Sequence, residues 1–156
     1  MMRLFFILSL LSLVPASAAP ATRLIQAQGS SPYCLFAVNA YLTDSDMWRL
    51  AAEYQRRGLP TWDGLVPYNE NVLALAVELH GGRSHVAPQW NSTAVRDAVR
   101  AGIPVAVSGS GHALVLIRWN SAGRITYVDS LHADAPQQMR DTAFWDWWDG
   151  WGWWVQ

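Results

Sequence analysis

Residues 31–42 read SPYCLFAVNAYL, and this stretch predicts a largely buried helix with a cysteine in its first turn. Serine is a preferred N-cap residue and proline is favoured at the first helical position, so we expect Ser31 to cap the helix and Cys34 to be its third residue. The apolar residues that follow recur at helical spacing as far as Leu42. Because the free N–H groups and the dipole of a first turn favour negative charge, this position favours a thiolate at Cys34.

Cys34 is the only cysteine of the chain, which excludes an intramolecular disulfide bond. A lone cysteine is often a small buried hydrophobic residue. The alternative is a nucleophile, which needs a rigid position near the surface and a stabilised thiolate. The position of Cys34 at a helix start favours the second interpretation.

The N-terminus carries a pattern typical of export. Residues 4–14 form an unbroken apolar run, which Arg3 precedes and Ala16-Ser17-Ala18 follows. This run is shorter than the roughly 20 residues that span a bilayer, and no other segment is long enough. We therefore predict a signal peptide at residues 1–18 and a mature domain at residues 19–156, either periplasmic or secreted.

Composition excludes several classes of protein. The 156 residues suit one domain, and a content of 51% hydrophobic and 15% charged residues excludes a disordered chain or a coiled coil. All 11 basic residues are arginine, which excludes a Schiff-base lysine and a phosphate-loop lysine and favours a GC-rich bacterial source. With 12 acidic residues and no basic patch, nucleic acid is not an expected partner. The four histidines form no metal-binding motif with the cysteine, so we expect neither a metal nor another cofactor.

Helical patterns come first in the chain and strand patterns follow. This order predicts an α+β fold in which N-terminal helices pack on a C-terminal antiparallel sheet. We expect helices at residues 34–42, 46–57, 71–80, 93–101 and 144–149, a loop at 59–70, and strands at 84–87, 103–107, 113–119, 125–128 and 153–155.

His112 and Asp129 lie at matching ends of two of these strands. Residues 108–111, SGSG, form a flexible approach to His112. If the turn that follows the His112 strand pairs Asn120 with Gly123, Asp129 faces Leu114, which shares a face of the sheet with His112. The two side chains are then diagonal neighbours within reach of each other. The alternative is that a strand-end histidine and a turn aspartate have separate roles.

A glutamine precedes the cysteine. Gln28 lies shortly before Cys34, where its side-chain amide could donate a hydrogen bond to an oxyanion beside the helix start. Gln26 is an alternative candidate for this role.

Taken in order, these residues resemble the papain-like cysteine peptidases. Gln28 precedes Cys34 at a helix start, the motif GHALV follows at residues 111–115, and YVDS follows at residues 127–130. The compact spacing is most similar to the double-glycine-leader (bacteriocin-processing) peptidases and their stand-alone relatives, over most of residues 26–156. The resemblance implies a papain-like fold and a peptide or protein substrate. It also implies that Cys34 is the nucleophile, His112 its acid and base, Asp129 the residue that orients His112, and Gln28 part of an oxyanion hole.

Two departures from the family pattern leave the substrate open. The cysteine stands in Tyr33-Cys34-Leu35, without the familiar Asp-Cys-Gly or Cys-Trp context, and the residue after Asp129 is not proline. Ser130 follows the aspartate where the leader peptidases usually have proline, and Asp129-Ser130-Leu131 is similar to ubiquitin-directed proteases, including Josephin-type enzymes. The same three catalytic residues also serve amidases and acyl transferases. A third alternative is an inactive binding module on the same fold. The sequence does not indicate the oligomeric state.

Six of the ten tryptophans lie within residues 145–154. Phe144, Trp147, Trp148 and Trp151 fit a helical stripe, which predicts core packing. The remaining aromatic surface could bind a peptide, a glycan or a membrane interface. We expect Gly111, beside the histidine, and Trp119, as a core or cleft-wall residue, to contribute to substrate binding.

Overall fold

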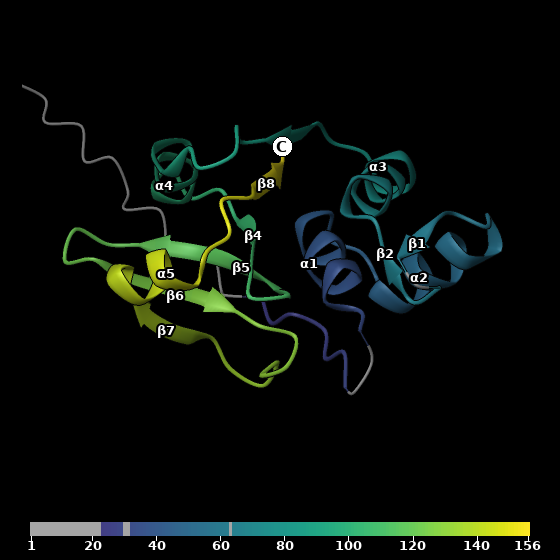
Figure 1. The fold of residues 1–156 in the computed structure, drawn as a ribbon, viewed down its shortest axis with the longest axis horizontal. Coiled ribbons are helices and arrows are strands. Elements are labelled where there is room, and N and C mark those ends of the chain that lie inside the picture. Colours follow the sequence, from purple (N-terminus) through teal and green to yellow (C-terminus); the bar gives the residue numbers. More distant parts are fainter. Residues whose placement is uncertain (1–22, 30–31, 63) are drawn as a thin grey trace, which may run out of the picture.

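The computed structural model describes residues 23–29, 32–62 and 64–156 (Figure 1). The predicted signal peptide and Ser31 lie outside the described residues. Within the described ranges, no helix is both long and apolar enough to cross a membrane. The figure shows the helices of residues 34–80 and a short hairpin gathered on one side of the molecule, with most of a sheet and the later helices on the other side.

The elements confirm an α+β fold with an antiparallel sheet. In the described part of the chain, one sheet has six strands in the order β3-β8-β4-β5-β6-β7, and β1 and β2 form a separate hairpin. The helices are α1 (Cys34–Leu42), α2 (Met47–Arg56), α3 (Asn69–His80), α4 (Ser92–Arg100) and α5 (Asp141–Trp147). The strands are β1 (Thr61–Trp62), β2 (Val66–Pro67), β3 (Ser84–Val86), β4 (Val105–Gly109), β5 (His112–Trp119), β6 (Arg124–Val128), β7 (Gln137–Arg140) and β8 (Gly152–Val155).

Two hydrophobic clusters bury both faces of the central strand β5. Val115 belongs to the first cluster, together with residues of α1, α2 and α3. Leu114 and Leu116 belong to the second cluster, together with residues of α4 and α5. Side chains alternate between the faces of a strand, so β5 is apolar at nearly every position. The apolar sequence of α1 has the same cause, since its residues 36–40 are all buried.

The start of α1 differs from the prediction. Its N-cap residue is Tyr33, which makes no side-chain cap hydrogen bond, so Cys34 is the first helical residue and not the third. The backbone N–H of Ala37 donates to the Tyr33 carbonyl at 3.0 Å, as the first bond of a helix capped at Tyr33 must. The predicted helix start, with Cys34 as the third helical residue, is therefore wrong by two positions. Cys34 still lies in the first turn, as expected.

A buried amide fixes α1 against its neighbours. Asn39 is fully buried, and its Nδ2 donates to the Oδ1 of Asn69 in α3 at 3.0 Å. Its Oδ1 accepts a hydrogen bond from Nε1 of Trp153 in β8, also at 3.0 Å. Buried polar groups are costly unless they are paired, so this network specifies one arrangement of α1, α3 and β8.

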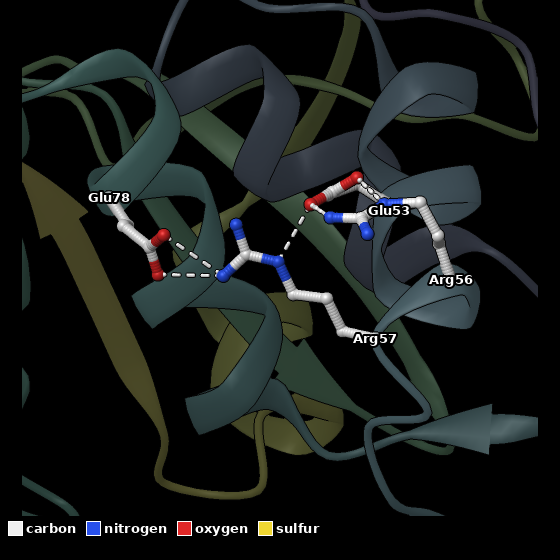
Figure 2. A network of polar contacts seen from close by, with 4 residues as sticks. All are labelled: Glu53, Arg56, Arg57 and Glu78. Atoms are coloured by element: carbon white, nitrogen blue, oxygen red, sulfur yellow. Dashed lines mark hydrogen bonds and ion pairs between the residues drawn. The ribbon is translucent and has the colours of Figure 1, made fainter.

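An ion-pair network joins the outer surfaces of α2 and α3 (Figure 2). The Arg57 guanidinium contacts Glu53 at 2.7 Å and both carboxylate oxygens of Glu78 at 2.9 Å. Arg56 also binds Glu53, and the hydrogen bonds from the two arginines lower the pKa of Glu53 to about 2. These charges are neutralised by one another at the surface.

Both hairpins of the central strands hold features that the sequence analysis did not predict. Gly109 pairs with His112, which leaves Ser110 and Gly111 as a two-residue turn with φ values of 49° and 75°. Positive φ at both positions is what a type I′ turn requires, so this segment is a tight turn and not a flexible approach. In the β5–β6 hairpin the loop is one residue longer than predicted, and a bulge between Leu116 and Arg118 absorbs the extra residue.

The C-terminal aromatic stripe is shorter than predicted. Helix α5 ends at Trp147, and Trp148 already has extended backbone angles. Phe144 and Trp148 are buried as expected, whereas Trp151 lies beyond the helix and is 45% exposed. A helical stripe therefore cannot include Trp151.

Candidate active site

His112 and Asp129 are brought together by adjacent strands. His112 opens β5 and Asp129 follows β6, and Nε2 of the imidazole lies 2.7 Å from Oδ1 of the carboxylate. The predicted register holds at this end of the hairpin, where Val115 pairs with Val128. The hydrogen bond that His112 donates to Asp129, followed by the neighbouring Cys34, raises the pKa of His112 from 6.5 to about 9. The imidazole is therefore cationic at neutral pH.

Cys34 approaches the same imidazole from the start of α1. The Cys34 side chain lies close enough to the His112 imidazole to help raise its pKa. Because Nε2 is occupied by Asp129, Nδ1 is the nitrogen left for Cys34. The first residue of α1 thus lies beside the first residue of β5. The three side chains are arranged in a row, in the order Cys34, His112 and Asp129.

Asp129 is held by more than the histidine. The backbone N–H of Leu131 donates to its Oδ1 at 2.9 Å, and Nδ1 of His132 lies 3.3 Å from its Oδ2. Burial by itself raises the pKa of Asp129, but the hydrogen bonds, led by that from His112, outweigh it and lower the pKa to about 2. The sequence analysis missed His132, for which the only signal is its position three residues after Asp129.

Gln28 lies next to the residue that follows Asp129. Gln28 and Ser130 are both buried, and the Gln28 backbone N–H donates to the Ser130 carbonyl at 3.1 Å. The Ser130 hydroxyl donates to Oε1 of Gln28. The alternative candidate, Gln26, serves α2 instead: its Nε2 donates to Asp46 at 2.9 Å, and its Oε1 accepts from the Met47 backbone N–H. The structure thus separates the two glutamines, and only Gln28 is tied to the Asp129 segment.

A groove of about 700 Å³ opens at the cysteine and the histidine. Gly111 lines it beside His112, as the sequence analysis expects of a substrate-binding residue. The opposite wall comes from the β1–β2 hairpin and the start of α3. This hairpin lies within the predicted loop at residues 59–70, where two-residue strands leave little signal in the sequence.

Trp119 does not line this groove, which corrects the expectation that it binds substrate. It is 4% exposed, and its ring packs on Phe144 and Trp145 with the Arg96 guanidinium 5.1 Å from its centroid. The β-bulge in β5 shifts the alternation of side chains, so that Ile117 packs against the first cluster and Trp119 belongs to the second. Trp119 is therefore a core residue on the face away from Cys34.

Within the described ranges, no group of three or more His, Cys, Asp or Glu side chains is arranged to hold a metal ion. The thiol of Cys34 and the imidazole of His112 line the groove, and the carboxylate of Asp129 completes a row with them through His112. This arrangement can deprotonate a nucleophile and later return the proton to a leaving group.

Comparison with known proteins places the fold. No protein-family model matches the chain, and no curated protein matches it in sequence. The peptidase domain of Streptococcus ComA, a bifunctional ABC transporter involved in quorum sensing, superposes with a TM-score of 0.64 at 14% identity, over 86% of this chain and 98% of that domain. A double-glycine-motif protease from an AMS/PCAT transporter, solved with its leader peptide, gives 0.63 at 15% identity, over 86% of this chain and 91% of the other.

A third solved structure agrees. The N-terminal peptidase C39-like domain of a toxin secretion ATP-binding protein from Vibrio parahaemolyticus has a TM-score of 0.58 at 15% identity, over 82% of this chain and 98% of that one. The chain therefore has a papain-like cysteine peptidase fold, similar to the domains that process double-glycine leaders. The resemblance predicted from the sequence is confirmed at the level of the fold.

Proposed function

We propose that the protein is an exported cysteine peptidase that hydrolyses a peptide or isopeptide bond. The observation that carries the proposal is the row Cys34–His112–Asp129: Cys34 and His112 line one groove, and Nε2 of His112 lies 2.7 Å from Oδ1 of Asp129. A cationic imidazole beside a thiol stabilises the thiolate, which is the nucleophilic form. The fold of the similar peptidase domains supports the same chemistry.

The reaction follows from the positions of these groups. The Cys34 sulfur attacks the carbonyl carbon of the scissile bond, and His112 gives its proton to the departing amine. The resulting thioester is hydrolysed by a water molecule that passes a proton back to His112. Asp129 orients the imidazole and favours its charged form throughout.

The negatively charged oxygen of the tetrahedral intermediate needs hydrogen-bond donors. We assign this role to the backbone N–H of Cys34, which as a first-turn donor has no partner within its helix, and to the amide of Gln28. The Ser130 hydroxyl donates to Oε1 of Gln28 and thereby fixes the orientation of that amide, which supports the assignment. One such donor typically contributes a factor of about 100 to 1,000 in kcat.

The substrate class and the cellular site complete the proposal. A peptide substrate is supported by the open groove and by the similar protease that was solved with its leader peptide. Export to the periplasm or the medium is supported by the pattern of residues 1–18.

The test is cleavage of an internally quenched peptide library by residues 19–156. Cys34→Ser and His112→Gln should each lower kcat/KM by a factor of about 100 or more. His85→Gln is the matched control, because His85 stacks on Trp154 with a centroid distance of 5.6 Å and does not line the groove. Cleavage that persists in Cys34→Ser would contradict the proposal.

A further inference from the structure

The groove beside Cys34 has an exposed tryptophan on each wall. Trp62 comes from the β1–β2 hairpin and is 58% exposed, and Trp151 precedes β8 and is 45% exposed. Val66 and Val86 add exposed apolar surface to the same two walls. Large apolar side chains that gather in one concave surface mark a binding site more often than a structural need.

Both tryptophans are held in place. The ring of Trp62 packs on Tyr68 with a centroid distance of 4.8 Å. The backbone carbonyl of Trp151 accepts hydrogen bonds from Nε1 of Trp148 at 2.7 Å and from the Ser108 N–H at 3.3 Å. Since the supporting backbone and rings are fixed, the aromatic walls are formed before a ligand arrives, which lowers the entropic cost of binding.

Each wall also carries a carboxylate. Glu70 lies in the first turn of α3, where the helix dipole favours its negative charge. Asp149 lies on the opposite wall, and its Oδ1 accepts from the Ser108 hydroxyl at 2.8 Å and from the Trp151 N–H at 3.3 Å. Both residues line the groove, and no arginine of the described ranges does.

These carboxylates differ from those on the outer surface. Glu53 and Glu78 are already paired with arginines (Figure 2), whereas Glu70 and Asp149 form no ion pair with any part of the chain that the structure describes. His112 is the only basic side chain in the groove lining, and its charge is engaged by Asp129. The groove therefore presents negative charge and aromatic faces together.

We infer that this groove selects peptide segments in which a basic side chain lies next to an apolar or aromatic one, close to the scissile bond. A lysine or arginine side chain is attracted both by carboxylates and by the faces of tryptophan rings. An acidic side chain in the same place is repelled by Glu70 and Asp149. The inference rests on the proposed function, since it names the substrate class of the same site.

The test compares internally quenched peptides that differ only in arginine or citrulline at one position. Citrulline keeps the shape of arginine and removes its charge. We expect kcat/KM to favour arginine about tenfold at low salt, because a carboxylate and a tryptophan face each contribute a small factor that salt weakens. A glutamate peptide should be cleaved more slowly than the citrulline peptide.

Variants assign the preference to the groove. Glu70→Gln and Asp149→Asn should each reduce the ratio of arginine to citrulline by about two- to threefold, and the double variant should reduce it further. Glu78→Gln, on the same helix but bound to Arg57, and Asp146→Asn, on α5 and outside the groove lining, are the matched controls. These controls should leave the ratio unchanged.

Binding to Cys34→Ser separates this inference from the proposed function. Fluorescence anisotropy with the same peptides, labelled with fluorescein, measures recognition without cleavage. If the wild type cleaves peptides and arginine gives no advantage, or the groove variants leave the advantage intact, the inference is overturned while the peptidase stands. If no peptide is cleaved but Cys34→Ser prefers arginine over citrulline, the inference stands and the peptidase fails. If neither cleavage nor preferential binding occurs, both are overturned.

Discussion

Replacing Asp129 by asparagine should lower the pKa of His112. Asparagine keeps the shape of the side chain and removes its charge, so the hydrogen bond to Nε2 no longer favours an imidazolium. The hydrogen bond that His112 donates to Asp129 is the largest cause that raises the pKa of His112 from 6.5 to about 9. This difference corresponds to about 3 kcal/mol in favour of the protonated form. In Asp129→Asn we expect the pKa to fall toward 6.5.

The fraction of His112 that carries a proton at neutral pH, and can therefore protonate a leaving group, should fall sharply in Asp129→Asn. With a pKa of about 9, nearly every His112 side chain carries its proton at pH 7.5, whereas with a pKa of 6.5 only about a tenth do. A ¹H–¹³C correlation spectrum of ¹³C-labelled histidine follows the titration of the imidazole directly, and the signal that is lost in His112→Gln is that of His112. A wild-type His112 that titrates near 6.5, or an unchanged pKa in Asp129→Asn, would refute this reasoning.

The same pair makes stability depend on pH. The pKa of His112 is higher in the folded chain, so its contribution is complete below about pH 6.5 and is lost as pH rises through about 9. The pKa of Asp129 is lower in the folded chain, so its contribution is complete above about pH 4 and is lost as pH falls toward 2. In urea unfolding, the stability difference between wild type and Asp129→Asn should be largest between about pH 4 and 6.5 and small at pH 10.

Three further predictions concern the Ser130 hydroxyl, the packing at Gly109 and the N-terminal segment. Ser130→Ala removes the hydroxyl that orients Gln28 and should lower kcat about tenfold with little change in KM; a change in KM alone would contradict this role. Gly109→Ala places a methyl group 2.3 Å from the Trp147 carbonyl oxygen and should lower the free energy of unfolding by about 1–3 kcal/mol, whereas an unchanged melting temperature would show that the strand does not pack so closely there. Expression of the full chain in an exporting bacterium should yield a product that begins at Ala19 by intact mass, and retention of residues 1–18 would argue against the signal peptide.

Much of the site could be predicted because local rules place its parts. A cap, a proline and an apolar run locate Cys34 in a first turn even though the actual cap is Tyr33. The alternation of β5 and β6 brings His112 to Asp129, and the predicted pairing holds at Val115 and Val128. The pairing holds there because the loop is one residue longer than predicted and the bulge in β5 compensates for that residue. The residue pattern of the hairpin predicts neither feature.

Other parts depend on contacts that a single sequence does not display. Strand β7 lies at the sheet edge and has Met139 as its only apolar residue, so it lacks the apolar alternation that marks a strand. The link between Gln28 and Ser130 joins residues far apart in the chain. The sequence predicts Trp119 as a core or cleft-wall residue that contributes to substrate binding, and the bulge that turns it into the second cluster is a tertiary feature.

The most direct test of the central claim is the rate at which iodoacetamide alkylates Cys34 at pH 6. Cys34 is the only cysteine and lines the groove, so intact mass reports its modification alone. A cysteine without a cationic neighbour is almost entirely protonated at pH 6 and reacts slowly. We predict that the wild type is alkylated at least about tenfold faster than His112→Ala. Equal rates, or no reaction in either protein, would contradict a nucleophilic Cys34 activated by His112.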